Sequence, residues 1–345
     1  MKLLFVLIGL FSFLPQMVFS EVQLEVLYGA DNRHHIEDSP APNFKILSLS
    51  TAMMIHEDKI ESAFDGVLTK IYTEKLGPAY YLCSEEKYYQ DIIAGKCSGF
   101  LVAPDLLVTA GHCITGESSC KYNKWIFDYR NDLILSSGEE DSVYVGSNNV
   151  YGCSEIINRK YSTISKNDFA LIRLDRPVVD RLPLKFRTEG KIENDSELVM
   201  IGHPLGLSSK ISYQANILKN ESPFFFKTNL DSFLGNSGSA VFNKKTGIVE
   251  GILVRGELDF DSHDEDDCEI VKVCPENGEG CKGEDITRIT VIPELAPGMT
   301  PTEPIEADPF DEVYDGTDSY SDFSDDDENI DWDCYFSDND NCDED

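Results

Sequence analysis

Hydrophobic and polar positions alternate over short distances along most of this chain. From about residue 44, short apolar runs are separated by Gly, Pro, Asn and Asp. Examples are residues 99–102, 106–109, 170–174, 198–201 and 251–254. Short β-type runs at this density are typical of an all-β sandwich or barrel. Helical periodicity is scarce, and residues 54–72 are the segment where it predicts a helix.

The N-terminal residues differ from this pattern. Lys2 precedes an apolar run from Leu3 to Leu14, and Val18-Phe19-Ser20 offers a small-residue exit, so residues 1–20 are predicted to be a secretory signal peptide. The alternative is an uncleaved membrane anchor, but the run is shorter than the roughly 18–20 apolar residues of a spanning helix. Residues 21–43 form a polar lead-in that could include a short propeptide.

The C-terminal residues 298–345 form an acidic tail. Residues 301–345 contain nineteen Asp or Glu and no Lys or Arg. Charge this dense and unopposed resists collapse, so we predict a largely disordered tail. Carboxylates could also bind Ca²⁺ there, but the tail lacks the regularly spaced acidic loop of a typical calcium site.

Composition narrows the class of protein. The chain has 345 residues, 41% of them apolar, which is enough for a packed core. Its formal charge of −34 argues against a nucleic-acid partner, because phosphate binding needs clustered Lys and Arg. Ten cysteines behind a signal peptide predict disulfides and a secreted protein, extracellular or periplasmic. A zinc site is the alternative, but paired Cys-x-x-Cys spacing is missing.

Three segments carry candidate chemistry. His112 follows two β-type runs joined by a Pro-Asp turn, Asp168 opens an otherwise apolar run, and Ser237 lies among small residues before another run. Taken singly, each residue is more often structural than functional. In the order His, Asp, Ser they favour a catalytic triad, and the order excludes the α/β-hydrolase arrangement, which runs Ser, acid, His.

At these segments the sequence resembles the trypsin-like (chymotrypsin-fold) serine endopeptidases, in particular the secreted bacterial branch near the glutamyl endopeptidases. The run Gly235-Asn236-Ser237-Gly238-Ser239 carries the resemblance at the nucleophile, and residues 31–36 resemble the start of the mature enzymes. The resemblance covers roughly residues 26–295. It implies two antiparallel β-barrels, at residues 44–185 and 186–297, with the active site in the cleft between them.

The roles of these residues follow from the resemblance and from physical chemistry. A serine hydroxyl needs a base with a pKa near 6.5, so His112 would take its proton and Asp168 would hold the imidazole in the useful tautomer. The backbone N–H groups of Gly235 and Ser237 would form the oxyanion hole. This chemistry needs no cofactor and no metal. The expected partners are protein or peptide substrates, with a monomeric enzyme and no membrane anchor after signal cleavage.

The resemblance also indicates a substrate preference. Asp231 lies six residues before Ser237, where a trypsin carries the carboxylate at the base of its specificity pocket, so cleavage after Arg or Lys is expected. Glutamyl-type specificity is the alternative, but Leu253 stands where those enzymes place a histidine. Arg255 falls on the expected pocket wall, where it could pair with Asp231 or bind acidic substrate residues. Asp231 could also be a local turn cap.

Two positions depart from the animal enzymes. Asn236 replaces an aspartate that receives a new N-terminus, so activation by N-terminal insertion is doubtful. Val254 replaces a serine that hydrogen-bonds the triad carboxylate, so Asp168 is expected to have one donor fewer.

We expect a Cys97–Cys113 disulfide, because these two cysteines flank the turn that presents His112, and next a Cys120–Cys153 disulfide, although connectivity is not encoded in the sequence. Cys83, Cys268, Cys274 and Cys281 would then pair among themselves.

Two other functions stay open. One is a catalytically silent relative of the peptidases that binds proteins or matrix. The other is an acidic, calcium-binding surface protein whose function depends on the tail.

Overall fold

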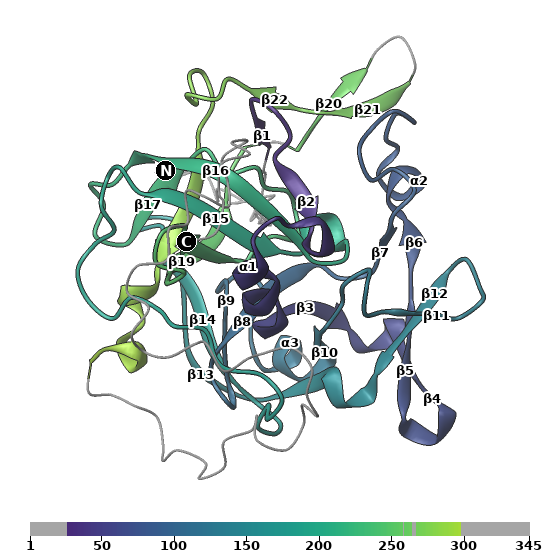
Figure 1. Cartoon of the computed structure of the whole chain (residues 1–345). Coiled ribbons are helices and arrows are strands. Elements are labelled where there is room, and N and C mark those ends of the chain that lie inside the picture. Colours follow the sequence, from purple (N-terminus) through teal and green to yellow (C-terminus); the bar gives the residue numbers. More distant parts are fainter. Residues whose placement is uncertain (1–25, 258, 264–266, 298–345) are drawn as a thin grey trace, which may run out of the picture.

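The structure is a computed structural model of the whole chain, and it describes residues 26–257, 259–263 and 267–297. The predicted signal peptide and the acidic tail lie outside the described residues. Most of the described elements are short strands (Figure 1). The helices among the described residues lack the length and apolar character needed to cross a membrane.

The first barrel is built from the strands that precede residue 175. Its strands pair in the closed antiparallel order β10-β13-β14-β9-β8-β3. They are β3 (Thr51–His56), β8 (Cys97–Ala103), β9 (Leu106–Thr109), β10 (Asn123–Phe127), β13 (Val150–Tyr161) and β14 (Asp168–Leu174). A four-stranded antiparallel sheet accompanies the barrel, formed by β4 (Ile60–Ala63), β5 (Leu68–Tyr72), β11 (Leu135–Ser136) and β12 (Ser142–Gly146).

The second barrel follows it in the sequence and lies above the first in Figure 1. Its strands pair in the order β15-β18-β19-β23-β17-β16, and a β15–β16 pairing closes the ring. They are β15 (Glu197–Gly202), β16 (Lys210–Lys219), β17 (Phe225–Thr228), β18 (Ala240–Asn243), β19 (Val249–Arg255) and β23 (Glu284–Arg288). The lead-in supplies one more strand, β2 (Arg33–His35), which pairs with β16. The expected all-β fold of two antiparallel barrels is confirmed.

The remaining elements are small. Three two-stranded sheets consist of β1 (Leu27–Tyr28) with β22 (Val273–Cys274), β6 (Glu74–Lys75) with β7 (Ile92–Ile93), and β20 (Phe260–His263) with β21 (Cys268–Val271). The helices are α1 (Pro42–Leu47), α2 (Leu76–Tyr80) and α3 (Glu117–Tyr122). Single 3-10 turns are η1 (Ile36–Asp38), η2 (Ser48–Ser50), η3 (Glu57–Lys59), η4 (Phe64–Gly66), η5 (Ser147–Asn149), η6 (Pro204–Gly206), η7 (Ile289–Val291) and η8 (Pro293–Leu295).

The helix predicted over residues 54–72 is wrong, because this segment forms the end of β3 and the hairpin of β4 and β5. Asp65 and Gly66 have φ of +55° and +87°, the left-handed backbone that an Asp-Gly hairpin turn requires. Ile60 and Ile71 pair directly across the hairpin. Their β-branched side chains suit a pleated surface, and the turn and this pairing override the weak helical spacing.

The two barrels share one continuous hydrophobic core. Its buried residues include Phe100 and Phe169 from the first barrel and Val199 and Phe242 from the second. Phe44 of α1 makes an edge-to-face contact with Phe242, with ring centroids 5.8 Å apart. Burying one such side chain contributes about 2–3 kcal/mol. The barrels therefore pack as one body, and residues at their junction have fixed relative positions.

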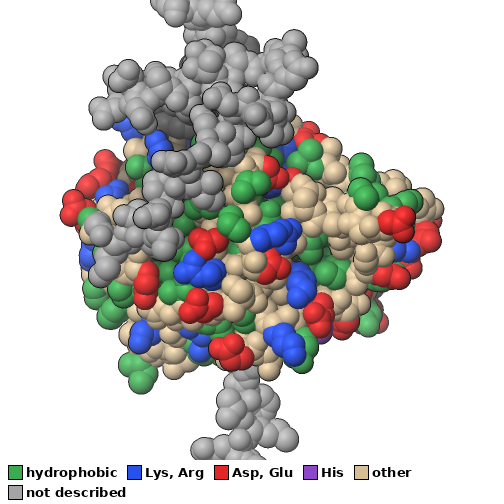
Figure 2. All heavy atoms as spheres, turned by 90° about the horizontal axis from the view of Figure 1, so that it is seen from below, with side chains coloured by type: hydrophobic (Ala, Val, Ile, Leu, Met, Phe, Trp, Pro, Cys, Tyr) green, Lys and Arg blue, Asp and Glu red, His purple; other side chains and the backbone are tan. Residues whose placement is uncertain are grey.

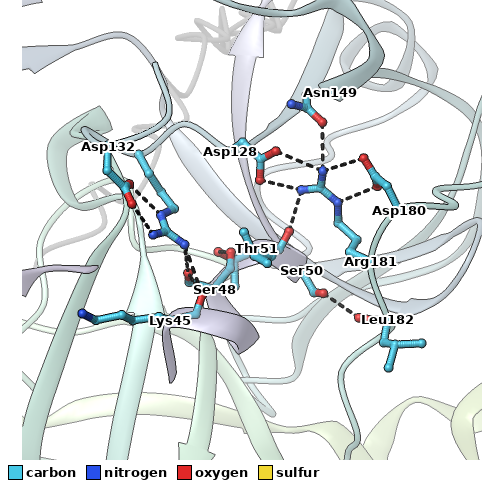
Figure 3. A network of polar contacts seen from close by, with 12 residues as sticks. Lys45, Ser48, Ser50, Thr51, Asp128, Asp132, Asn149, Asp180, Arg181 and Leu182 are labelled. Atoms are coloured by element: carbon cyan, nitrogen blue, oxygen red, sulfur yellow. Dashed lines mark hydrogen bonds and ion pairs between the residues drawn. The ribbon is translucent and has the colours of Figure 1, made fainter. Parts of the chain in front are cut away.

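The segment that connects the barrels is anchored by Arg181 (Figure 3). Its guanidinium reaches Asp128 at 2.7 Å and Asp180 at 2.8 Å, and it also donates to the backbone carbonyl of Leu49 and to Asn149. Burial opposes the charge of Arg181, but the pairs with Asp180 and Asp128 prevail and raise its pKa. The connection is thereby fixed to the first barrel.

Candidate active site

His112 and Asp168 meet at one edge of the first barrel. His112 follows β9, and the Cys97–Cys113 disulfide links the residue after it to the start of β8, with Cα atoms 6.4 Å apart. Asp168 is the first residue of β14 and is fully buried. Its Oδ2 lies 2.9 Å from His112 Nδ1, and its Oδ1 accepts the backbone N–H of His112 at 3.0 Å. These bonds hold the imidazole and the carboxylate in one orientation, with the Nε2 side left to face a nucleophile.

Ser237 lies on a glycine-rich turn that precedes β18 and touches the first barrel. Its carbonyl accepts the backbone N–H of Ser98 at 2.8 Å. Gly238 has φ of +93°, and a Cβ at that position would lie 2.0 Å from the Ser98 carbonyl oxygen. Only glycine allows this approach of the turn to the first barrel. The sequence therefore places Ser237 at the junction of the two barrels.

The hydroxyl of Ser237 is buried and has no hydrogen-bond partner among the described residues. The structure thus contains the hydrogen bond between His112 and Asp168 but not a hydrogen bond between His112 and the Ser237 hydroxyl. Catalytic hydrogen bonds in proteins without substrate are often long or poorly aligned and tighten when substrate binds.

Two backbone N–H groups on the Ser237 turn are available for an oxyanion. The N–H groups of Asn236, Gly238 and Ser239 all reach backbone carbonyls. In the described part of the chain, those of Gly235 and Ser237 make no backbone hydrogen bond. Gly235 has φ of +97°, which glycine adopts without strain. These are the two donors that the sequence predicts for the oxyanion hole.

Arg255 contacts the buried carboxylate of Asp168, so in this arrangement its guanidinium pairs with Asp168 rather than with Asp231. Its Nη2 lies 3.1 Å from Asp168 Oδ2, the oxygen that also faces His112. Its Nη1 donates to the Lys166 carbonyl at 3.3 Å and lies 3.6 Å from Asp285 Oδ2. The expectation that Asp168 has one hydrogen-bond donor fewer is therefore wrong. Val254 supplies none, but the guanidinium of Arg255 donates to Asp168 instead. The signal available in the sequence was a charged residue at the end of an apolar strand.

Asp231 is covered by the N-terminal segment of the described chain. It is 2% exposed, and its two oxygens accept the backbone N–H groups of Tyr28 at 2.7 Å and of Asn32 at 2.8 Å. Burial raises the pKa of Asp231 to about 7, although these two bonds act in the opposite direction. In this arrangement the carboxylate binds backbone and does not face a substrate.

Two further buried acids lie near Asp231, and sequence reasoning missed both. Glu284 is fully buried and accepts the hydroxyls of Ser232 at 2.6 Å and of Tyr28 at 3.3 Å. Asp259 accepts the backbone N–H of Leu234 at 3.1 Å. Burial raises the pKa of Glu284 and of Asp259 well above the ordinary values. Nothing in the sequence around these two residues distinguishes them from exposed acids.

The described cysteines are all in disulfides. Cys97–Cys113 and Cys120–Cys153 are both present as predicted, and the other four form Cys83–Cys268 and Cys274–Cys281. Two groups of His and Cys come close enough together to suggest a metal site, and each contains one of these disulfides. Because a metal binds the thiolate, these cysteines are not available as ligands.

Comparisons with known proteins agree with the geometry. Residues 97–252 match the family described as a trypsin-like peptidase domain. This match spans β8 to β19 and contains His112, Asp168 and Ser237, and it confirms the resemblance seen in the sequence. In this stretch the chain is similar to the trypsin-like peptidases.

Individual relatives match over shorter stretches. Chymotrypsin-like elastase family member 3B of Macaca mulatta is 39% identical over 80 residues, which are 23% of this chain and 29% of the relative. The Homo sapiens protein of the same name is 38% identical over 80 residues, 23% and 27% of the two chains. The chain thus spans less than a third of the length of these curated relatives. A solved structure of a Glu endopeptidase in complex with MPD aligns with 15% identity and a TM-score of 0.39, over 77% of this chain and 94% of that one.

Proposed function

We propose that this protein is a secreted serine endopeptidase that uses His112, Asp168 and Ser237. The observation that carries the proposal is the His112–Asp168 pair, with Nδ1 and Oδ2 2.9 Å apart on a fully buried carboxylate. It lies in a trypsin-like peptidase domain beside a serine turn that the first barrel supports. A buried carboxylate fixed on an imidazole is the arrangement that keeps Nε2 free as a base.

The proposed reaction has two halves. Ser237 Oγ attacks the scissile carbonyl carbon while His112 Nε2 takes the hydroxyl proton, and the oxyanion is held by the N–H groups of Gly235 and Ser237. The C–N bond then breaks, and His112 gives its proton to the leaving amine. Water attacks the resulting ester in the same way, releasing the acid and restoring the hydroxyl. One oxyanion donor is typically worth about 3–4 kcal/mol in the transition state.

The buried hydroxyl sets one requirement for this reaction. Ser237 Oγ has no partner in the described structure, so its side chain must turn into hydrogen-bond reach of His112 when substrate enters. A tightening of this kind on substrate binding is common in hydrolases.

Cleavage after Arg or Lys in the substrate stays a prediction, and it requires a rearrangement around Asp231. A basic substrate side chain reaches Asp231 only after Tyr28 and Asn32 withdraw from its two oxygens. Burial favours the neutral form of Glu284 and Asp259. Their ionisation on opening of this region would add negative charge there and favour a basic side chain over an acidic one. A peptide-library cleavage profile tests this, and preference for Glu would establish the glutamyl alternative.

A fluorophosphonate probe tests the reaction class itself. The probe phosphonylates an activated serine, so the wild-type protein should be labelled and Ser237→Ala should not. The control variant is Ser239→Ala, which lies on the same turn and should keep its label. Absence of labelling, or labelling that persists in Ser237→Ala, would contradict the proposal.

A catalytically silent binding protein is the second candidate. The unpartnered, buried hydroxyl of Ser237 is the observation that favours it. Where side chains are visible in Figure 2, basic and acidic ones are interspersed, and the visible part of this face shows no patch of one charge for a partner. If the probe leaves the wild-type protein unlabelled while the protein is folded, this candidate replaces the first.

A further inference from the structure

Arg255 shares an oxygen atom with the catalytic histidine. Asp168 Oδ2 lies 2.9 Å from His112 Nδ1 and 3.1 Å from Arg255 Nη2. The guanidinium is itself held in place, because Nη1 donates to the Lys166 carbonyl at 3.3 Å. A fixed cation therefore touches the carboxylate that orients the base.

The surroundings of Arg255 allow its charge to be removed without leaving a buried acid alone. Asp285, which Arg255 approaches to 3.6 Å, also pairs with Lys227 at 2.6 Å and with Lys166 at 3.2 Å. Asp168 keeps its two bonds to His112. A neutral side chain at position 255 therefore leaves both carboxylates with partners.

We propose that Arg255 is a positioning residue of the active site: it orients the Asp168 carboxylate, and its charge opposes that of the imidazolium form of His112. The inference rests on the proposed function for its catalytic meaning. The contact between Arg255 and Asp168 does not depend on the proposed function, because it is present in the structure whatever reaction the protein catalyses.

The direction of the effect follows from charge. The imidazolium form of His112 is stabilised by the negative charge of Asp168 and destabilised by a cation on the same carboxylate. Among the described residues, ionisable side chains near His112 include Arg159, whose Nε donates to the Gly111 carbonyl at 2.6 Å, and Tyr161, whose ring centroid lies 6.3 Å from that of the imidazole. Lys166, Lys227 and Asp285 surround the other side of Arg255. Substitution of Arg255 removes one of the three cations that contact Asp285 and leaves its two lysine partners in place.

The test measures His112 directly and needs no activity. In the Ser237→Ala protein, the imidazole proton signals are followed by NMR against pH, and the His112 signal is assigned by its loss in His112→Ala. Adding Arg255→Gln should raise the midpoint of the His112 titration by about one pH unit, because a charge this close shifts a titration by one unit or more. Arg255→Met is a second neutral variant and should give the same shift.

Two controls separate a specific contact from a general change in charge. Lys166→Gln removes a cation that touches Asp285 but not Asp168, so the midpoint should stay at its original pH. Arg255→Lys keeps the charge and should also stay there. In active enzyme, the acid limb of the kcat/KM profile should move upward with Arg255→Gln alone.

The inference is overturned if Arg255→Gln and Arg255→Met leave the His112 midpoint unchanged, or if Lys166→Gln shifts it equally. A wild-type protein that neither hydrolyses peptides nor reacts with fluorophosphonate would instead remove the proposed function. The NMR comparison would still decide the role of Arg255, so the two failures are distinguishable.

Discussion

The buried carboxyl group of Asp231 should make the stability of this protein fall as the pH rises. Burial raises its pKa to about 7, whereas an aspartate in an unfolded chain titrates near 3.9. Between these values the folded state holds a proton that the unfolded state has released. The stabilisation is therefore complete below about pH 4 and is lost as the pH rises through about 7. Asp231→Asn removes this titration.

The size of the effect follows from the separation of the two values. A separation of about three pH units, at about 1.4 kcal/mol per unit, corresponds to a loss of about 4 kcal/mol, of which about 2 kcal/mol falls between pH 5 and pH 7. The asparagine introduces an opposing cost, since its NH₂ group faces one of the two backbone N–H groups now bound to Asp231. An unsatisfied buried donor costs about 1–3 kcal/mol at every pH. Relative to wild type, the variant should therefore gain about 2 kcal/mol of stability between pH 5 and pH 7, and it should be the more stable protein at pH 8.

Urea unfolding with the disulfides intact, followed by tryptophan fluorescence at pH 5, 6, 7 and 8, measures this difference. The series stays above the sequence pI of about 4.3, where the chain carries enough charge to remain dissolved. Asp195→Asn is the matched control, because it removes one carboxylate from an exposed position. It shows how much of any pH-dependent difference comes from the loss of a single carboxylate at the surface.

A constant difference between Asp231→Asn and wild type across this series would refute the reasoning. It would mean that Asp231 is ionised in the folded protein at pH 5, and that Tyr28 and Asn32 stabilise the carboxylate enough to cancel its burial. Glu284 and Asp259 are present in both proteins, so their own titrations cancel in the comparison.

Three more predictions follow from the site and the fold. Asp168→Asn should lower kcat on a peptide substrate by about ten-thousandfold, as in related triads, because the imidazole adopts the wrong tautomer. Arg181→Ala should lower the unfolding free energy in urea by about 3 kcal/mol, since it leaves partly buried carboxylates without a partner, whereas Arg173→Ala, whose ion pairs are more exposed, should cost under about 1 kcal/mol. Replacing Cys97 and Cys113 with alanine should lower the unfolding free energy by about 3 kcal/mol, the amount expected for opening a loop of this length, and calorimetry should show a lower Tm.

Much of the fold could be predicted because its strands are short, apolar and bounded by turn residues. The runs at 106–109, 170–174, 198–201 and 251–254 all lie within strands of the two barrels. Residues 54–72 were predicted wrongly because their apolar spacing fits a helix and a hairpin alike. The pairing of Ile60 with Ile71 decided between them, and such a pairing is a tertiary contact that local spacing does not encode.

Site residues could be predicted from the sequence only where they lie in a recognisable local motif. His112, Asp168 and Ser237 each lie in a recognisable segment, and the structure joins the first two by a hydrogen bond. The partner of Arg255 was not predictable, because Asp168 is 87 positions away and either of two aspartates fitted the charge. The same holds for Asp231, whose partner Tyr28 lies 203 positions earlier and contributes only its backbone N–H. Every residue except proline has a backbone N–H group, so the sequence does not show which one will bind a given carboxylate.

The N-terminal segment and the serine turn depend on one another. Asp231 accepts the N–H of Tyr28, and the N–H of the next residue, Ser232, donates to the Val26 carbonyl at 3.1 Å. The guanidinium of Arg33 lies 3.9 Å from the ring centroid of Phe233.

These contacts hold three consecutive residues, 231–233, that lead into the turn carrying Gly235 and Ser237. Movement of residues 26–33 away from Asp231 would therefore also remove contacts that support the turn carrying Gly235 and Ser237. Under the proposed function, the N-terminal segment would then affect both the access of a substrate side chain to Asp231 and the position of the two oxyanion donors.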